Sequence, residues 1–503
     1  PGRRVPSCNW MRWIPILLLA HVLVAAPGLK QRIDKILETS PAARRAHWGI
    51  HVADLATGKT LYARSEDRFF VPASNTKLFS TSLALLRLGP DHRFQTLVIA
   101  EQAPDAAGRV AGDLILYGGG DPSMSGRPLP YQRGAAAGQP LAAIDELAAQ
   151  IAARGVRRID GDLVGDDTAY VWDPYPDGWA QNDTIWEYGA PVSALTVNDN
   201  TISLTLKPGA RVGDPASIAL SPAREYYQID NRVRTSAQGE RRIRLDRPAG
   251  SRELRIWGTI PRGGEGVTQL LAIDDPALYA ALALAGALER RGVTIRGRAL
   301  ARHRPLNQLD DPAKGTPPAP PAGVELARRQ SQPLIEILRV VNKISQNLEA
   351  ELVLREVGRV RRGVGSREAG IEELKAMLAE AGAAKDDYYF QDGSGLSRLT
   401  LITPSLATRL LRFVHSTPIG GEWVKLLPVG GEDGTLASRF EGRPAGRGIL
   451  AKTGSLSHVG ALSGYAERGG KPALVFSVIV NNYNSPASEI RRVIDKIGLS
   501  LVE

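Results

Sequence analysis

The sequence predicts a mixed α/β (α+β) fold in which the two ends of a 503-residue chain form one discontinuous domain. A β-hairpin expected at residues 47–63 needs further strands to join, and the alternating stretches that begin near residue 448 supply them. A long central region of mainly short β stretches separates these parts. It ends at a Pro-rich linker, residues 314–323. We therefore expect a split domain with a large insertion.

Composition gives an ordinary globular balance, with 43% hydrophobic and 23% charged residues. The formal net charge of +10 suits an anionic cell envelope, although it fits plain solubility equally well. The arginines are scattered and no nucleic-acid-binding motif occurs, so we expect no nucleic acid as a partner.

An apolar run at residues 13–26 follows Arg12 and ends in small residues, which predicts a secretory signal peptide covering residues 1–26. The run is short for a membrane-spanning helix. Pro27 leaves the cleavage site open, and a retained anchor is the alternative. The single cysteine, Cys8, precedes the run, so the mature chain is expected to hold no disulfide. A periplasmic or extracytoplasmic location follows, with peripheral or no membrane association after cleavage.

The first elements after this segment follow from apolar periodicity and turn residues. They are a helix at 31–37, strands at 47–53 and 60–63, and a helix running from Pro72 to Gly89-Pro90. His47 and His51 share one face of the first strand. Because the predicted strand at 47–53 holds no carboxylate or cysteine, we interpret both as structural rather than as metal ligands.

The central region predicts a small strand–helix–strand module followed by β-rich sequence. The expected strands are 97–100, 112–117, 161–165 and 201–206, with another around Arg241 to Leu245. The expected helices are 140–154 and 276–291. Gly118-Gly119-Gly120 lacks the spacing and the following lysine of a phosphate-binding loop, so a turn is the better interpretation.

Helices dominate after the linker, and strands return at the end of the chain. The expected helices are 334–344, 348–358, 370–382, 404–413 and 485–497. The expected strands are 448–452, 461–467 and 473–481, and residues 392–398 form a loop.

Ser74 and Lys77 carry the first chemical signal. On one helix the first and fourth residues share a face, so the Ser74 hydroxyl and the Lys77 amine can meet. A serine hydroxyl is a poor nucleophile until a nearby base takes its proton. Lysine serves as that base when burial or neighbouring cations lower its pKa. Alone, Ser-x-x-Lys is a weak motif.

Two later stretches strengthen it. Ser345-Gln346-Asn347 and Lys452-Thr453-Gly454 follow in the order that penicillin-binding proteins and class A β-lactamases share. With these three motifs the sequence resembles the class C low-molecular-mass penicillin-binding proteins, the D-alanyl-D-alanine carboxypeptidase/endopeptidase family. The resemblance covers essentially the whole mature chain. It includes residues 72–79, 342–351, 392–398 and 451–455, and the inserted stretches 118–123, 159–162 and 188–195.

The resemblance implies a penicillin-recognising transpeptidase/β-lactamase-like domain, an antiparallel sheet flanked by helices, with two nested inserted domains. More than 260 residues separate Lys77 from Ser345, which fits such insertions. We expect the catalytic domain at 27–90 and 323–503, a β-rich insertion at 91–112 and 188–322, and a nested small α/β domain at 113–187.

The resemblance also implies roles. Ser74 would attack the carbonyl of the penultimate D-alanine, with Lys77 as proton acceptor. Ser345 would relay a proton to the departing amine, and Asn347 would hold the substrate's amide backbone. Lys452 and Thr453 would hold the terminal carboxylate, and Lys452 would also keep the cleft positive and so keep Lys77 neutral. Gly454 would let the strand approach the substrate, and the backbone amides of Ser74 and Ser455 would hold the oxyanion. Water would deacylate the enzyme, so neither a metal nor an organic cofactor is implied.

Peptidoglycan stems carry a long polar side chain before D-Ala-D-Ala, and it ends in an amine and sometimes a carboxylate. Reading that amine requires a carboxylate at the cleft mouth. We predict Asp166 and Asp167, at the end of an inserted strand, for this role. Arg398, in the same loop as Leu396, would meet the carboxylate end, and Leu396 is a further expected substrate contact. A solvated turn is the alternative for the two aspartates.

The expected partners are peptidoglycan stem peptides ending in D-Ala-D-Ala, with β-lactam antibiotics as inhibitors. A serine β-lactamase is the nearest rival, but the chain lacks a Glu-x-x-Leu-Asn pentapeptide for deacylation, and its second motif reads Ser-Gln-Asn. An α/β-hydrolase would need a Gly-x-Ser-x-Gly elbow, which is absent. A non-catalytic wall-binding scaffold remains the alternative from another class, although Ser74, Lys77 and Lys452 are all present. Carboxypeptidase and endopeptidase activities are not separable from sequence.

Overall fold

The structure is a computed structural model that describes residues 2, 28–222, 226–248 and 250–502. The apolar run at 13–26 and Cys8, on which the signal-peptide prediction rests, lie outside these residues. Within the described part of the chain, no helix is both long and apolar enough to cross a membrane.

The main sheet joins the two ends of the chain, as the hairpin predicted. Its order is β19-β20-β21-β1-β2, and every neighbouring pair is antiparallel. The strands are β1 (His47–Asp54), β2 (Thr60–Arg64), β19 (Ile449–Leu456), β20 (Val459–Arg468) and β21 (Lys471–Asn481). Apolar residues line both faces of the central strands, because helices cover the sheet on each side.

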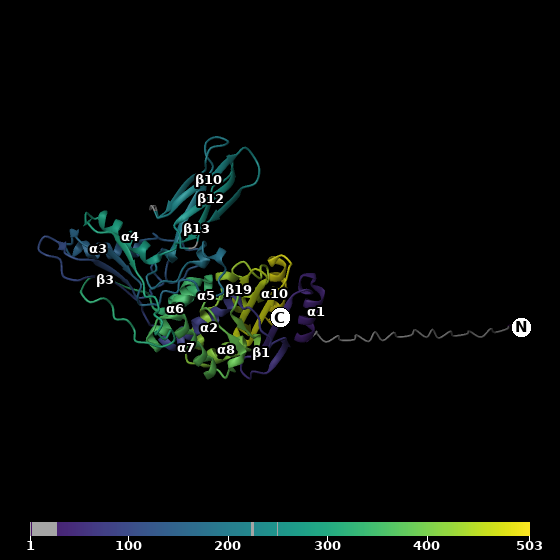
Figure 1. The fold of residues 1–503 in the computed structure, drawn as a ribbon. Helices are drawn as coiled ribbons and strands as arrows, with labels where there is room; N and C mark the ends of the chain where they lie inside the picture. The colour runs from purple at the N-terminus through teal and green to yellow at the C-terminus, as the bar shows by residue number, and fades with distance from the viewer. Residues whose placement is uncertain (1, 3–27, 223–225, 249, 503) are drawn as a thin grey trace.

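One face of this sheet is covered by the terminal helices α1 (Leu29–Thr39) and α10 (Ala487–Val502). The apolar stripe of α10 faces inward, with Ile490, Val493 and Ile497 buried. The other face is covered by α2, α8 and the helices around them (Figure 1). These are α2 (Thr76–Leu88), α5 (Leu334–Ile344), α6 (Asn347–Arg362), α7 (Arg367–Glu380), α8 (Pro404–Ser416) and α9 (Gly420–Lys425).

Helix α2 lies at the centre of this arrangement. Every residue from Thr76 to Leu85 is buried, so the helix is enclosed on all sides rather than along one stripe. It contacts α5, α6, α7 and α8. The helix that carries Lys77 is therefore held rigidly.

The inserted part contains a five-stranded sheet of order β15-β7-β5-β3-β16. Its strands are β3 (Gln95–Ala100), β5 (Leu114–Gly118), β7 (Leu163–Asp166), β15 (Ala299–Arg302) and β16 (Val324–Gln330). Helices α3 (Ala142–Ala153) and α4 (Pro276–Glu289) pack into the same core. The short strands β4 (Arg109–Val110), β6 (Arg158–Ile159) and β14 (Thr294–Ile295) form a small sheet beside it.

The β-rich sequence forms two three-stranded sheets, β13-β8-β9 and β10-β12-β11, that share one core. They project from the rest of the molecule (Figure 1). The strands are β8 (Thr201–Lys207), β9 (Ser217–Ser221), β10 (Gln228–Ser236), β11 (Arg242–Asp246), β12 (Glu253–Pro261) and β13 (Val267–Ala272). A two-stranded ribbon elsewhere pairs β17 (Tyr388–Tyr389) with β18 (Leu401–Ile402).

The predicted domain limits stay a proposal. The pairing does show that β3 is hydrogen-bonded to β5, although these strands were assigned to different inserted domains on either side of residue 112. Strand β16, which begins just after the predicted return to the catalytic domain, is the other edge of the same sheet. Sequence periodicity identifies strands and helices but not which strands pair. This explains why the predicted domain limits separate strands that are paired in one sheet.

Candidate active site

Ser74 lies at the entrance to helix α2. It occupies a 3-10 turn, η2 (Ala73–Asn75), directly before the α-helix, and not the first α-turn that the sequence predicted. Ala73 adopts a left-handed backbone with φ +48°, which is uncommon outside glycine. This sharp entry leaves Ser74 half-exposed while its neighbours on both sides are buried.

Asn75 fixes this turn to the edge strand of the main sheet. The Asn75 side chain donates from Nδ2 to the Lys452 backbone carbonyl at 2.8 Å. Its side-chain oxygen, Oδ1, accepts from the Ser463 hydroxyl on β20 at 2.7 Å. Gly454 allows the close approach, because a Cβ there would lie 2.6 Å from the Pro72 carbonyl oxygen. We expected Gly454 to make room for substrate. The structure shows that it makes room for the turn that presents Ser74, and its role toward the substrate stays a prediction.

Lys77 is completely buried beside the nucleophile. Its Nζ lies 3.0 Å from Ser74 Oγ, 2.6 Å from Asn347 Oδ1 and 2.7 Å from the Ser394 carbonyl. Burial lowers the pKa of Lys77 to about 7, against the opposing charges of Asp392 and Glu351. About half of an amine with a pKa near 7 is unprotonated at neutral pH and can act as a base. The predicted shared face of Ser74 and Lys77 is confirmed.

A second serine–lysine pair faces the first. Ser345 sits between α5 and α6 in a left-handed conformation with φ +66°, and its Oγ accepts from Lys452 Nζ at 2.8 Å. Burial lowers the pKa of Lys452 well below its ordinary value, and the nearby Lys77 charge acts in the same direction. The cleft thus combines two buried amines, and the charge of Lys77 disfavours the ammonium form of Lys452. For Lys77, however, burial is the largest cause of the low pKa.

Asn347 links the two halves of the cleft. Its Oδ1 accepts from Lys77, and its Nδ2 donates to the Tyr188 carbonyl at 2.7 Å. Tyr188 belongs to η4 (Glu187–Gly189), which lies in the inserted part of the sequence. The inserted chain therefore touches the motif that binds Lys77.

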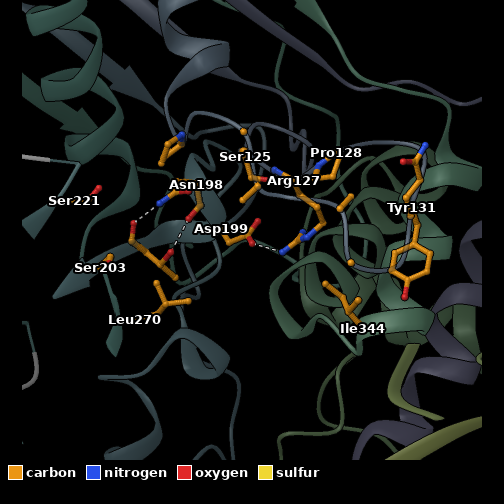
Figure 2. A pocket seen from close by; sticks show the side chains of 18 residues that line it. Ser125, Arg127, Pro128, Tyr131, Asn198, Asp199, Ser203, Ser221, Leu270 and Ile344 are labelled. Atoms are coloured by element: carbon orange, nitrogen blue, oxygen red, sulfur yellow. Dashed lines mark hydrogen bonds and ion pairs between the residues drawn. The ribbon is translucent and has the colours of Figure 1, made fainter. Parts of the chain in front are cut away.

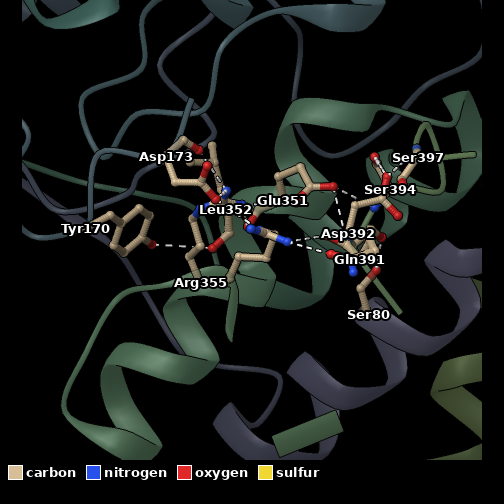
Figure 3. A network of polar contacts seen from close by, with 12 residues as sticks. Ser80, Tyr170, Asp173, Glu351, Leu352, Arg355, Gln391, Asp392, Ser394 and Ser397 are labelled. Carbon is tan, nitrogen blue, oxygen red and sulfur yellow. Dashed lines mark hydrogen bonds and ion pairs between the residues drawn. The ribbon is translucent and has the colours of Figure 1, made fainter. Parts of the chain in front are cut away.

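A buried network positions the loop at residues 392–398 (Figure 3), and the Ser394 carbonyl of this loop accepts from Lys77 Nζ. Glu351 Oε1 accepts from the backbone amides of Gly393 and Ser394 at 2.9 and 2.8 Å, and Arg355 pairs with the same carboxylate at 3.0 Å. Asp392 accepts from the Ser394 hydroxyl and from the Ser397 amide. These contacts aim the Ser394 carbonyl at Lys77 Nζ. Glu351 and Asp392 are positioning residues that sequence reasoning missed.

A pocket of about 270 Å³ opens from Ser74. Its lining includes five predicted residues, Ser74, Asn347, Leu396, Arg398 and Ser455, and others that were not predicted. The full lining is Ser74, Asp183, Tyr188, Asn347, Gly395, Leu396, Arg398, Ser455, Leu456 and Ser457. Two of these bear opposite charges, Asp183 and Arg398, and so could bind a ligand that carries both an ammonium and a carboxylate.

Thr453 is placed differently from the pocket residues. Its hydroxyl donates to the Thr435 hydroxyl at 2.8 Å, next to Lys452 and Ser345. It lies within β19, whereas Ser457 follows the last residue of that strand, and Thr453 does not line the pocket. Gly454 and Lys452 are both buried behind it.

Asp166 and Asp167 are not brought to the cleft. Both side chains are 2% exposed. Asp166 pairs with Arg302 at 3.1 Å, and Asp167 contacts His303 at 3.0 Å and accepts from the Ser193 hydroxyl at 2.8 Å. Carboxylates that are themselves buried and already paired with cationic side chains are structural, so the role predicted for these two residues is wrong. The signal that could have pointed to Asp183 is the run of aromatic residues around it, but nothing local places that run beside Ser74.

Comparison with known proteins agrees with this geometry. The model of the D-Ala-D-Ala carboxypeptidase 3 (S13) family matches residues 29–499. The chain is 37% identical to the D-alanyl-D-alanine carboxypeptidase of Actinomadura sp. (strain R39), covering 100% of this chain and 91% of that protein. It is 25% identical to D-alanyl-D-alanine carboxypeptidase DacB of Haemophilus influenzae, over 83% of this chain and 81% of that one.

The fold matches the crystal structure of penicillin binding protein 4 (dacB) from Haemophilus influenzae with a TM-score of 0.78. The alignment covers 93% of this chain and 98% of that one at 22% identity. A structure of the same protein complexed with a β-lactam aligns with a TM-score of 0.73.

Proposed function

Because the chain belongs to the D-Ala-D-Ala carboxypeptidase 3 (S13) family, we propose that it hydrolyses peptidoglycan stem peptides ending in D-Ala-D-Ala through an acyl-enzyme on Ser74. The observation that carries this proposal is the 3.0 Å contact between Ser74 Oγ and a fully buried lysine amine whose pKa is about 7. That pair supplies a nucleophile and its base within hydrogen-bond reach.

Acylation begins when Lys77 takes the proton of Ser74. The Ser74 oxygen then bonds to the carbonyl carbon of the penultimate D-alanine. Collapse of the tetrahedral intermediate breaks the C–N bond, and the departing amine of the terminal D-alanine needs a proton. We propose that Ser345, whose Oγ accepts from Lys452 Nζ at 2.8 Å, relays to this amine the proton that Lys77 took from Ser74. The pairing of two amines with two hydroxyls thus matches the two proton transfers of the step.

Lys452 and Thr453 are proposed to bind the terminal carboxylate. The carboxylate of a bound substrate would bring a negative charge next to Lys452. This charge would raise the pKa of Lys452 and favour its ammonium form. The backbone amides of Ser74 and Ser455 are proposed to hold the oxyanion, and Ser455 lies on the pocket wall beside Ser74. Water then attacks the ester, the D-alanyl product leaves, and Ser74 regains its proton.

The pocket beside Ser74 supports a revised account of specificity. Asp183 is proposed to bind the side-chain ammonium of the stem peptide, in place of Asp166 and Asp167. Arg398, whose guanidinium donates to the Ser457 carbonyl at 3.4 Å, is proposed to bind the carboxylate at the same end. Leu396 would contact the aliphatic part between the two charges.

β-Lactams mimic the D-Ala-D-Ala amide and are proposed to acylate Ser74 and remain attached. Among the described residues, the pocket lining holds one carboxylate, Asp183, and the sequence has no Glu-x-x-Leu-Asn pentapeptide, with which class A β-lactamases deacylate. A serine β-lactamase is therefore the weaker candidate. An extracytoplasmic site of action follows from the substrate.

The direct test is release of D-alanine from a stem pentapeptide. We expect Ser74→Ala to lower the rate by roughly three orders of magnitude or more. Ser82→Ala is the matched control, since this hydroxyl lies on the same helix and donates to the Phe79 carbonyl within it. Activity in Ser74→Ala comparable with wild type would refute the proposal, and so would a wild-type protein that releases no D-alanine.

A further inference from the structure

The inserted loop at residues 125–140 reaches from the β-rich sheets to the cleft. It forms one wall of a second pocket, of about 510 Å³, whose other walls are one face of the β13-β8-β9 sheet and Ile344 at the end of α5. Figure 2 shows the sheet residues on one side of this pocket, Tyr131 and Ile344 on the other, and Arg127 between them. The loop thus brings inserted sequence next to the helix that precedes the second motif.

Arg127 fixes the start of this loop to the cleft. Its guanidinium pairs with Glu349 on α6 at 2.5 Å and is also bonded to Asp199. Glu349 is buried and lies two residues after Asn347, with which α6 begins. The loop is therefore anchored on the helix that carries the second motif.

Further along, the loop is anchored on the segment at residues 429–436. The Tyr131 hydroxyl accepts from the Gly434 backbone amide at 3.1 Å, and the Arg133 guanidinium donates to the Glu432 carbonyl. Both contacts are made to backbone groups, so they fix the path of this segment and not only the orientation of one side chain. The inserted loop thus connects α6 to residues 429–436.

The same segment is held from α5. Lys343 Nζ lies 2.5 Å from Asp433 Oδ2 and donates to the Leu427 carbonyl at 2.7 Å. Gly434 has a left-handed backbone with φ +54°, and a Cβ there would lie 2.4 Å from the Lys343 carbonyl oxygen. The backbone amide that Tyr131 binds therefore has one possible position relative to α5.

Thr435, the next residue, faces the third motif. Its hydroxyl accepts from the Thr453 hydroxyl at 2.8 Å, and both residues are half-exposed. Lys452 Nζ donates to Ser345 Oγ at 2.8 Å and to the Thr453 carbonyl at 3.0 Å. Among the described residues these are its two acceptors, so its ammonium form keeps one hydrogen for a ligand. A carboxylate held by Lys452 and Thr453 would thus arrive beside Thr435.

Binding of that carboxylate changes what the two hydroxyl groups must do. A hydroxyl has one hydrogen and can also accept, whereas a carboxylate only accepts. The Thr453 hydroxyl must therefore turn its hydrogen from Thr435 to the substrate. Thr435 can then donate to the Thr453 oxygen, so that the 2.8 Å contact is kept with its direction reversed. This donation orients the Thr453 hydroxyl and strengthens the bond that it makes to the carboxylate.

We propose that Thr435 is a positioning residue that orients the Thr453 hydroxyl toward the terminal carboxylate, and that the inserted loop holds Thr435 in place through Tyr131. This inference rests on the proposed function and gives the inserted region a part in substrate recognition. The contact with the carboxylate is made in the ground state and in the transition state alike. Loss of the Thr435 hydroxyl should therefore raise KM and leave kcat unchanged.

The experiment compares two stem pentapeptides that differ only at the end, one with a free carboxylate and one with a carboxamide. Thr435→Val keeps the shape of the side chain and removes the hydroxyl. We expect it to lower the ratio of the kcat/KM values, carboxylate over amide, about tenfold, and Thr435→Ser to restore the ratio. Thr417→Val is the matched control, since the Thr417 hydroxyl donates to the Val414 carbonyl at the end of α8.

Tyr131→Phe tests the part assigned to the inserted loop. It removes the acceptor of the Gly434 amide, and we expect the same ratio to fall about threefold. Tyr389→Phe is its control, because the Tyr389 hydroxyl accepts from the Gln391 side chain at 2.7 Å, outside the inserted loop. A wild-type ratio in Tyr131→Phe would overturn this part of the proposal.

Labelling with saturating fluorescent penicillin shows that each variant is folded. An unchanged ratio in labelled Thr435→Val would overturn the proposal, and so would equal losses on both substrates, which indicate a purely structural role. A wild-type enzyme that cleaves both substrates equally well would overturn it as well, while hydrolysis through Ser74 would stand. A wild-type protein that cleaves neither and is not labelled would refute the proposed function itself.

Discussion

At the scale of single residues, burial explains the chemistry. Lys77 has no exposed surface, and desolvation of its ammonium brings the pKa from the ordinary range near 10.5 to about 7. Asp392 and Glu351 raise it again, so the value reflects a balance that keeps the amine close to neutrality. A general base is most effective when its pKa lies near the working pH.

Replacing this amine should therefore stop the reaction while leaving the site in place. We expect Lys77→Ala to slow β-lactam acylation of Ser74 by about 10²–10⁴-fold. Stopped-flow measurement of the acylation rate tests this. A near-wild-type rate in Lys77→Ala would show that another group takes the Ser74 proton.

The same pKa predicts a pH profile. The neutral amine is the base, and its fraction rises as pH increases through the folded-state pKa of about 7. The acylation rate of the wild type should consequently rise between about pH 6 and pH 8 and then level off. A rate that is constant over this interval, in a protein whose fold is unchanged by circular dichroism, would contradict the assignment.

Specificity provides a second test at this scale. Asp183→Asn should reduce the preference for a stem peptide with a free side-chain amine over its acetylated form by roughly five- to 150-fold, the equivalent of about one to three kcal/mol. Glu187→Gln is the control, an exposed carboxylate nearby that does not line the pocket. If both variants keep the wild-type preference, Asp183 does not read the amine.

At the scale of elements, the site depends on how closely β19 approaches the start of α2. Gly454 has ordinary backbone angles, so the requirement is for space: an added Cβ would meet the Pro72 carbonyl at 2.6 Å and the Ala461 Cβ at 3.0 Å. The glycine of the third motif thus leaves the space that the turn carrying Ser74 occupies against β19.

Gly454→Ala should therefore displace the η2 turn. We expect a loss of about 1–3 kcal/mol in the free energy of unfolding, together with slower acylation. Gly421→Ala in α9 is the matched control, since a Cβ there meets nothing within 4 Å. Denaturant unfolding and β-lactam labelling of both variants provide the comparison. Wild-type stability of Gly454→Ala would contradict the prediction, because it would show that the backbone adjusts to the added Cβ without loss of stability.

The sequence predicts the helices and strands better than it predicts which distant segments pack against one another. The Ser74–Lys77 pair could be predicted because the two residues are three positions apart at one helix. The main sheet could be predicted because a β-hairpin needs further strands to pair with. Asp183 could not be predicted, since it comes close to Ser74 only when the inserted segment packs on the 392–398 loop. Three contacts make that packing, from Trp179 to Asp392, from Ser397 to the Asp177 carbonyl, and from the Arg398 amide to the Gly178 carbonyl.

At the scale of the whole molecule, the inserted region supplies walls rather than chemistry. The segment around Asp183 and Tyr188 closes one pocket, and the loop at 125–140 closes the other. The nucleophile, both lysines and Asn347 come from the discontinuous domain. This division explains why the role predicted for Asp166 and Asp167 is wrong. Both carboxylates are paired with other residues of the inserted region and stabilise it.

The central claim is that Ser74 becomes acylated with Lys77 as its base. The most direct test is the intact mass of the protein after brief incubation with benzylpenicillin, followed by identification of the modified peptide. We predict one added penicillin per chain, located on Ser74, none in Ser74→Ala, and slow addition in Lys77→Ala. An unmodified wild-type protein, or an adduct on a different residue that persists in Ser74→Ala, would contradict the account.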